Sequence, residues 1–206
     1  MVYKIVYAIV SVLLRLLFTI DYRNREIIRE YKTNGRPFVI CSNHISAVDP
    51  LFIIIGRGKG RKLTIMGKEE LFKIGILSWF FTQLGVIPVA RGTGDRGVLE
   101  KAINDAKDGA GILIFPEGTR GNGNEMGKIK SGAFAVAAAA QADIIPVRII
   151  YHTKTGRMKL FCKVTTAFGQ PLKIEDTQLD NGSRQQIRVV KAQLEESFAA
   201  LLEEYK

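Results

Sequence analysis

The chain has 206 residues, of which 47% are hydrophobic and 24% are charged, proportions that suit one domain of ordinary size with a substantial core. Thirty Lys and Arg residues against twenty Asp and Glu residues give a net charge of +10, which favours a polyanionic partner such as nucleic acid, anionic lipid or a phosphorylated substrate. Nucleic acid is excluded as the leading candidate, because the sequence has no zinc-finger spacing and no aromatic–basic RNA motif.

The cysteine and histidine content argues against a metal centre. Two cysteines, Cys41 and Cys162, and two histidines are too few for the usual zinc sites. Two cysteines also do not make a disulfide framework. We therefore expect no metal and no bound cofactor, and the cysteine usage suits a reducing cytosol.

The N-terminal stretch from Val2 to Ile20 is almost entirely apolar. A signal peptide does not fit, because Arg15 interrupts the apolar run and no small-residue cleavage site follows. As a helix, the run from Ile5 to Ile20 would reach only ~24 Å, against a hydrocarbon core of ~30 Å. The pattern favours a helix lying in one leaflet, with a buried core helix as the alternative. Its polar residues fall on one narrow stripe of that helix: Lys4, Ser11, Arg15 and Thr19.

A polar segment from Asp21 to Lys32 follows, at the expected level of lipid headgroups. We therefore predict a membrane-associating helical segment over residues 1–33 and an α/β domain over residues 34–206. No internal repeat and no Pro-, Gly- or Ser-rich linker divides the chain.

Short apolar runs alternate with longer helical patterns in the second part, which predicts an α/β fold: a single domain with a mostly parallel mixed sheet flanked by helices. The predicted strands are Pro37–Cys41, Lys62–Met66, Val86–Val89, Gly111–Phe115, Ile144–Ile150 and Met158–Thr166. The predicted helices are Pro50–Ile55, Glu69–Leu84, Asp95–Lys107, Gly132–Gln141 and Arg184–Glu204.

Three of the predicted helices have distinct patterns. Residues 71–84 are apolar nearly all round, so this part is either deeply buried or faces lipid. Residues 133–142 have small side chains, which predicts close packing against a sheet. Arg184–Glu204 has apolar residues at intervals of three or four with polar residues opposite, which is typical of a surface helix packed on a core.

His44 and Asp49 are the first candidates for chemistry, and both follow the first predicted strand. A continuous helix would separate two residues five apart, but a turn between strand and helix could fold His44 onto the Asp49 carboxylate. An aspartate at Nδ1 of a histidine fixes its tautomer and stabilises the imidazolium when Nε2 takes a proton. Asp49 also has a structural alternative, as the N-cap of a helix that has Pro50 at its first position.

Two further predicted strands lead into charged residues. Val86–Val89 is followed by Arg91, and Gly111–Phe115 is followed by Glu117 and Arg120. Ligands bind at the carboxyl ends of the strands in open α/β sheets. The sequence therefore predicts one site at this edge of the sheet, where these residues meet the histidine–aspartate pair.

Four short blocks occur in a fixed order along the chain. They are Asn-His-x4-Asp at residues 43–49, Gly-x-Ile-Pro-Val-x-Arg at 85–91, Phe-Pro-Glu-Gly-Thr-Arg at 115–120 and Ile-Pro-Val at 145–147. This series resembles the glycerolipid acyltransferases, in particular the bacterial 1-acylglycerol-3-phosphate acyltransferases. The stretches that begin at Lys68 and Lys130 are also similar to the family, although Ser131 replaces the second basic residue before Gly132. The resemblance covers residues 37–150.

The resemblance implies direct transfer of a fatty-acyl chain from an acyl thioester to the sn-2 hydroxyl of 1-acylglycerol-3-phosphate, without an acyl-enzyme. It implies that His44, oriented by Asp49, is the general base, and that Arg91 and Arg120 bind the phosphate. The sequence agrees with direct transfer, since it has no Gly-x-Ser-x-Gly nucleophile elbow. The other residues assigned to substrate binding are Asn43, Lys68, Glu117, Gly118 and Thr119.

The co-substrate would be acyl-CoA or acyl-acyl carrier protein, and the partners would be a lysophospholipid, an anionic membrane surface and acyl carrier protein. We expect a monotopic protein on the cytoplasmic face of the cell membrane. Glycerol-3-phosphate or another lysolipid is the alternative acceptor, and a non-catalytic lipid- or nucleotide-binding module is the alternative class. Residues 92–97 match the Gly-x-Gly-x-x-Gly dinucleotide-binding pattern, but Pro88 in the preceding strand disfavours that reading.

Overall fold

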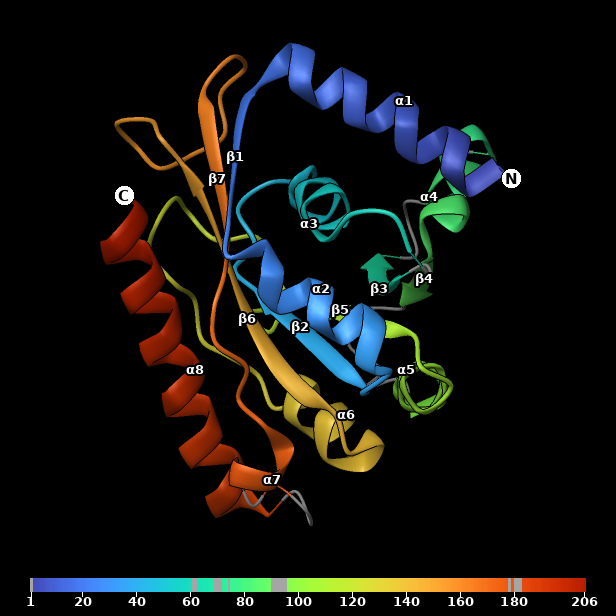
Figure 1. Ribbon diagram of the computed structural model, residues 1–206, viewed down its shortest axis with the longest axis vertical. Coiled ribbons are helices and arrows are strands. Elements are labelled where there is room, and N and C mark those ends of the chain that lie inside the picture. The colour runs from blue at the N-terminus through green and yellow to red at the C-terminus, as the bar shows by residue number, and fades with distance from the viewer. Residues whose placement is uncertain are drawn as a thin grey trace.

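A mixed β-sheet runs through the centre of the computed structural model, which describes residues 2–60, 63–68, 72–73, 75–89, 96–177, 179 and 183–206. Within these residues the sheet has seven strands in the order β1-β7-β6-β2-β5-β3-β4 (Figure 1). Neighbouring strands are parallel, except that β6 and β7 are antiparallel. The strands are β1 (Thr19–Arg23), β2 (Phe38–Ser42), β3 (Leu63–Lys68), β4 (Val86–Val89), β5 (Gly111–Ile114), β6 (Asp143–Tyr151) and β7 (Lys163–Phe168).

Helices cover both faces of this sheet (Figure 1). One core forms between the sheet and α1–α4, and a second core forms between the sheet and α5–α8. The described helices are α1 (Val2–Leu17), α2 (Arg25–Asn34), α3 (Asp49–Arg57), α4 (Gly75–Leu84), α5 (Arg96–Lys107), α6 (Gly132–Ala140), α7 (Ile174–Thr177) and α8 (Arg184–Tyr205).

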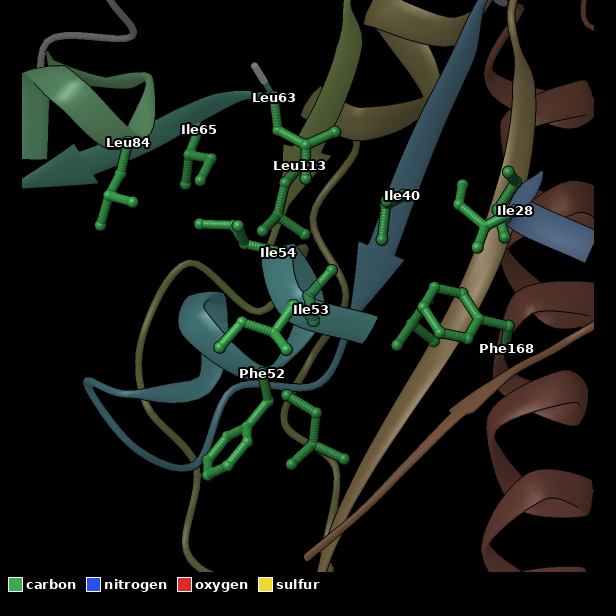
Figure 2. Close-up of a cluster of buried hydrophobic side chains, with 14 of the residues drawn as sticks. Ile28, Ile40, Phe52, Ile53, Ile54, Leu63, Ile65, Leu84, Leu113 and Phe168 are labelled. Carbon is green, nitrogen blue, oxygen red and sulfur yellow. The ribbon is translucent and has the colours of Figure 1, made fainter. Parts of the chain in front are cut away.

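Side chains of β2 alternate between the two cores. Phe38 and Ile40 pack beneath α1–α4, whereas Val39 and Cys41 pack beneath α5, α6 and α8. Strands that are covered on both faces need nearly continuous apolar runs, and every residue of β2, β5 and β6 is buried. Figure 2 shows the first core, where side chains of α3 gather with those of β2, β3, β5 and β7.

The predicted fold class, a single α/β domain with a mostly parallel mixed sheet flanked by helices, is confirmed. The close packing predicted for residues 133–142 is also confirmed, because α6 buries six of its nine residues, four of them alanines. The strands and helices differ from the predicted ranges mainly at their ends. The helix predicted from Glu69 has its described part in α4, which begins at Gly75, and residues 69–71 and 74 lie outside the described residues.

The N-terminal segment differs most from the prediction. The helix predicted to run to Ile20 ends at Leu17, and Thr19–Arg23 forms β1 at the edge of the sheet. The polar segment that follows contains α2, which buries Ile27 and Ile28 in the core. The strand predicted from Met158 begins only at Lys163, because the preceding residues form the connection between β6 and β7.

Helix α1 has a buried face and an exposed apolar face. Val6, Val10 and Leu14 recur every four residues and pack into the first core. The opposite side exposes five large apolar side chains to between 51% and 68%: Ile5, Ile9, Val12, Leu13 and Leu16. The alternative that this segment is a buried core helix therefore holds only for the face with Val6, Val10 and Leu14. In the part of the chain that the structure describes, no helix has both the length and the hydropathy needed to cross a membrane.

Asp143 is the first residue of β6 and binds residues of three other segments. Its buried carboxylate accepts hydrogen bonds from Tyr31 Oη (2.7 Å) and the Ile174 N–H (2.9 Å), and it pairs with Arg36 (3.3 Å). Asp143→Ala would leave the buried hydroxyl and N–H without an acceptor, so we expect the free energy of unfolding to fall by about 2–4 kcal/mol. Urea denaturation measures this, with the exposed Asp176→Ala as the matched control. An equal loss in both variants would contradict the assignment.

Candidate active site

The segments that follow β2 and β5 meet at the carboxyl edge of the sheet. The two strands are parallel neighbours with Cys41 opposite Ile114, so the chain leaves both at the same side. His44 follows β2 closely, and residues 115–120 follow β5. The structure therefore brings His44 together with Glu117, as the strand pattern predicts.

His44 and Asp49 form a hydrogen-bonded pair. His44 Nδ1 lies 3.0 Å from Asp49 Oδ2, and the same carboxylate oxygen accepts the N–H groups of Ile45 (2.6 Å) and Ser46 (2.7 Å). The Asp49 side chain has no exposure to solvent, whereas that of His44 is 19% exposed. The turn between β2 and α3 thus folds the histidine back onto the carboxylate.

Asp49 does not cap α3. It is the first residue of that helix, Val48 stands at the N-cap position without a side-chain capping bond, and Pro50 comes second. The carboxylate points back to N–H groups of the preceding turn instead of forward into the helix. The N-cap alternative for Asp49 is therefore wrong, and its hydrogen bonds serve the turn and the histidine.

Tyr151 completes the surroundings of Asp49. Its hydroxyl donates to Asp49 Oδ1 at 2.5 Å from the carboxyl end of β6. Burial, together with the charge and hydrogen bond of Asp49, raises the pKa of Tyr151 well above its usual range, so the phenol remains a donor. Sequence reasoning missed Tyr151, because it lies just past the blocks that resemble the family, at the end of a mostly apolar strand.

Phe115 covers one face of the His44 ring. The two ring centroids are 4.1 Å apart and the planes differ by 24°, so the rings are stacked. With Asp49 at Nδ1 and Phe115 on one face, the imidazole has a fixed orientation. Nε2 is then the nitrogen that can exchange a proton with a substrate.

Asn43 anchors the backbone just before the histidine. Its amide Nδ2 donates to the Ile149 carbonyl (2.9 Å) and its Oδ1 accepts the Ile149 N–H (2.7 Å). The side chain is 2% exposed and continues the pairing of β2 with β6 by one step. This geometry favours a structural role for Asn43 over the predicted contact with substrate.

Glu117 holds the backbone of His44. Its buried carboxylate accepts the His44 N–H at Oε1 (3.0 Å) and the Gly127 N–H at Oε2 (2.8 Å). The His44 carbonyl in turn accepts the Gly121 N–H at 2.7 Å. Both backbone groups of the histidine are therefore tied to the 117–127 segment, so Glu117 is placed to position His44 rather than to contact an acceptor.

The next three residues, Gly118, Thr119 and Arg120, are exposed beside the buried Glu117. Gly118 has a φ of +70°, and a Cβ atom there would lie 2.6 Å from the Lys130 Nζ. The side chain of the exposed Lys130 thus lies over this turn. The backbone N–H of Lys130 also donates to the Pro116 carbonyl (2.8 Å). Two cations, those of Arg120 and Lys130, stand on the segments around the turn.

Of the two remaining predicted binding residues, Lys68 lies on the next strand of the sheet. β3 ends at Lys68, whose Cα is opposite Val89 at the end of β4, so this residue is at the same sheet edge. Arg91 lies outside the described residues.

Arg148 is a buried cation that the sequence did not reveal. It is 2% exposed on β6 and donates to the Asn124 carbonyl. Burial lowers the pKa of Arg148 to about 10, and the nearby negative charge of Glu117 opposes the shift. The guanidinium therefore stays charged at neutral pH and offsets the buried Glu117 carboxylate.

This arrangement suits general-base chemistry. The His44–Asp49 pair can accept a proton at Nε2 and stabilise the resulting imidazolium. Cys41 is not a candidate nucleophile, because complete burial raises the pKa of its thiol to about 12. Among the described residues, no group of three or more His, Cys, Asp or Glu side chains could hold a metal ion.

A histidine backed by a buried aspartate, at the carboxyl edge of an α/β sheet, is an arrangement that can activate a hydroxyl or water for acyl chemistry. The sequence matches the Acyltransferase family over residues 19–150, which is more than half of the chain. The protein belongs to this family.

Two relatives and one solved structure illustrate the similarity. Chloroplastic 1-acyl-sn-glycerol-3-phosphate acyltransferase from Arabidopsis thaliana is 32% identical over 129 residues, 62% of this chain and 35% of that protein. Lyso-ornithine lipid O-acyltransferase from Pseudomonas aeruginosa is 30% identical over 119 residues, 57% of this chain and 44% of that protein. The chain thus matches less than half the length of either relative. The crystal structure of the 1-acyl-sn-glycerophosphate acyltransferase PlsC from Thermotoga maritima has the same fold, with a TM-score of 0.73 at 22% identity over 100% of this chain and 80% of that one.

Glu117→Gln distinguishes a positioning residue from a substrate contact. The amide oxygen can accept only one of the two N–H groups, and the amide nitrogen faces the other, so His44 should shift. We expect kcat for acyl transfer to fall about 10–100-fold with little change in KM, measured with both substrates varied. Glu125→Gln, an exposed change in the same segment, is the control. A raised KM at unchanged kcat would identify Glu117 as a substrate contact instead.

Proposed function

We propose that the protein is a membrane-associated O-acyltransferase. It moves a fatty-acyl chain from an acyl thioester to the sn-2 hydroxyl of 1-acylglycerol-3-phosphate and produces phosphatidate. The hydrogen bond between His44 Nδ1 and the fully buried Asp49 carboxylate is the observation on which this rests most directly. Family membership and the name of the Arabidopsis relative support the reaction and the acceptor.

The proposed reaction is one direct displacement. His44 Nε2 takes the proton of the acceptor hydroxyl while its oxygen attacks the thioester carbonyl. The new C–O bond forms, the C–S bond breaks, and the departing thiolate receives the proton from the imidazolium, which restores neutral His44. Asp49 stabilises the imidazolium in between, and general-base catalysis of this kind contributes ~10²–10⁴-fold.

The acceptor phosphate would bind to the cations at this edge of the sheet. Arg120 is exposed directly after the turn that holds Glu117, and Lys130 lies over the same turn. A guanidinium matches phosphate bidentately, so we assign phosphate binding to Arg120, with Arg91 as a further predicted ligand. Gly118 and Thr119 would line this side of the acceptor, and Lys68 remains a predicted contact at the end of β3.

The acyl donor would be acyl-CoA or acyl-acyl carrier protein. A net charge of +10 suits either the phosphates of coenzyme A or the acidic surface of a carrier protein. A second acceptor deserves the same assay, because the Pseudomonas relative is named for a lyso-ornithine lipid. Competition between lysophosphatidate, glycerol-3-phosphate and lyso-ornithine lipid would identify the preferred acceptor.

We further propose that α1 attaches the enzyme to the cytoplasmic face of the cell membrane, as the membrane-contacting part of the predicted 1–33 segment. Its exposed face consists of large apolar side chains, and its charged residues, Lys4 and Arg15, are both basic. An amphipathic helix of this composition lies in the plane of an anionic interface.

The catalytic pair is tested in detergent micelles with acyl-CoA and lysophosphatidate. We expect His44→Ala to lower kcat by about 10²–10⁴-fold and Asp49→Asn to lower it strongly as well. His152→Ala is the matched control, since His152 lies at the start of the connection after β6 and its ring is hydrogen-bonded to Thr165 of β7. Normal turnover by a folded His44→Ala variant would rule out the proposed base. Bound lysophosphatidate with no product from any donor, even in the parent protein, would favour a non-catalytic lipid-binding module.

Membrane attachment is tested without disturbing the core. Ile9→Ser, Val12→Ser and Leu16→Ser together remove the three most exposed large apolar side chains of α1 and leave Val6, Val10 and Leu14 in place. We expect this variant to lose most of its binding to anionic vesicles in sedimentation assays, because buried apolar area drives interfacial binding. Unchanged circular dichroism would exclude unfolding. Full vesicle binding by the triple variant would refute attachment through α1.

A further inference from the structure

The connection between β6 and β7, residues 152–162, exposes large apolar side chains. Met158, Leu160 and Phe161 are 37%, 54% and 72% exposed. Phe161 has the highest exposed fraction among the large apolar side chains that the structure describes. None of these three side chains belongs to either hydrophobic core.

The backbone at Phe161 is also unfavourable for an aromatic residue. Its φ is +62°, in the left-handed region that glycine and asparagine adopt more readily. The turn is held there by the Phe161 N–H, which donates to the Leu17 carbonyl at 2.8 Å. Glycine or asparagine would satisfy this turn with less strain, so the aromatic ring is not explained by local structure.

This connection continues the apolar face of α1. The bond from Phe161 to Leu17 joins it to the end of that helix, where Leu16 is 68% exposed. In Figure 1 the connection lies at the end of the molecule where α1 passes into β1. The apolar side chains therefore extend beyond one helix onto a second element.

The charged residues of the connection and of α1 are all basic. Residues 152–162 contain Lys154, Arg157 and Lys159 and no Asp or Glu, and α1 likewise contains no acidic residue. Apolar side chains surrounded by exposed cations fit an anionic lipid surface, where rings and aliphatic chains enter the interface and ammonium groups meet phosphates.

We propose that Leu160 and Phe161 form a second membrane-insertion point, which together with α1 sets the orientation of the enzyme on an anionic bilayer. The proposal rests on the membrane attachment proposed for α1. A helix alone can roll about its long axis, whereas a helix and a separate loop define a plane. The loop begins at His152, directly after Tyr151 that contacts Asp49, so the membrane-facing end and the catalytic edge of the sheet are adjoining.

Phe161→Asn is the first test, since asparagine tolerates the positive φ and should keep the turn intact. We expect its partition coefficient for vesicles of phosphatidylcholine and phosphatidylglycerol to fall about tenfold. Val189→Ser, which removes a 53% exposed apolar side chain on α8, should leave partitioning unchanged. Equal partitioning of Phe161→Asn and the parent protein would overturn the proposal, and so would an effect of the same size in the α8 variant.

A fluorescent reporter tests insertion directly. The chain has one tryptophan, Trp79, so a Trp79→Phe, Phe161→Trp variant has its only indole at the loop. We expect its emission to shift to shorter wavelength on vesicles and to be quenched by brominated phosphatidylcholine. Unshifted, unquenched emission from vesicle-bound protein would overturn the proposal.

Detergent assays separate this proposal from the proposed function. Phe161→Asn should transfer acyl chains in micelles at the parental rate while binding vesicles more weakly. Absence of acyl transfer in the parent protein would contradict the proposed reaction. The vesicle measurements would still decide whether Leu160 and Phe161 insert into the membrane. If Phe161→Asn partitions normally but loses affinity for acyl carrier protein, the loop is a protein-docking surface and not an insertion point.

Discussion

The buried charge of Asp49 is the constraint on which the site depends. A carboxylate without access to water is costly unless donors surround it, and Asp49 has four: His44 Nδ1, two N–H groups of the β2–α3 turn, and the Tyr151 hydroxyl. Each donor comes with a fixed direction, so satisfying the charge also sets the turn, the start of α3 and the end of β6. The orientation of the imidazole follows from that arrangement.

Glu117 is a second buried carboxylate whose charge must be satisfied, and it binds the main chain of His44. Its carboxylate is buried as well, but it accepts backbone N–H groups and lies near the buried cation of Arg148. The two carboxylates therefore have different tasks, since Asp49 acts on the ring of His44 and Glu117 acts on its main chain. Beside this buried framework stand the exposed cations of Arg120 and Lys130.

Much of the fold and part of the site could be predicted from the sequence, because both depend on short-range patterns. Apolar runs bounded by turn residues identify β2, β5 and β6, and His44 and Asp49 are close enough in the chain for one turn to join them. β1 was hidden, because its first two residues, Thr19 and Ile20, continue the apolar helical pattern, its other residues begin the polar segment, and its partner β7 is distant in sequence. The contact between Tyr151 and Asp49 could not be predicted, because the two residues are 102 positions apart in the sequence. The hydrogen bonds of Glu117 could not be predicted either, because its partners are main-chain N–H groups, which every residue type except proline has.

That long separation has a consequence for how the chain becomes active. The turn of residues 44–49 can form early, since its contacts are local, but the bonds from Tyr151 and from Asn43 to Ile149 require β6 to dock beside β2. The fully anchored His44–Asp49 pair therefore requires the assembled sheet and not the turn alone. A molecule in which β6 is not docked would possess the histidine without its fully anchored carboxylate.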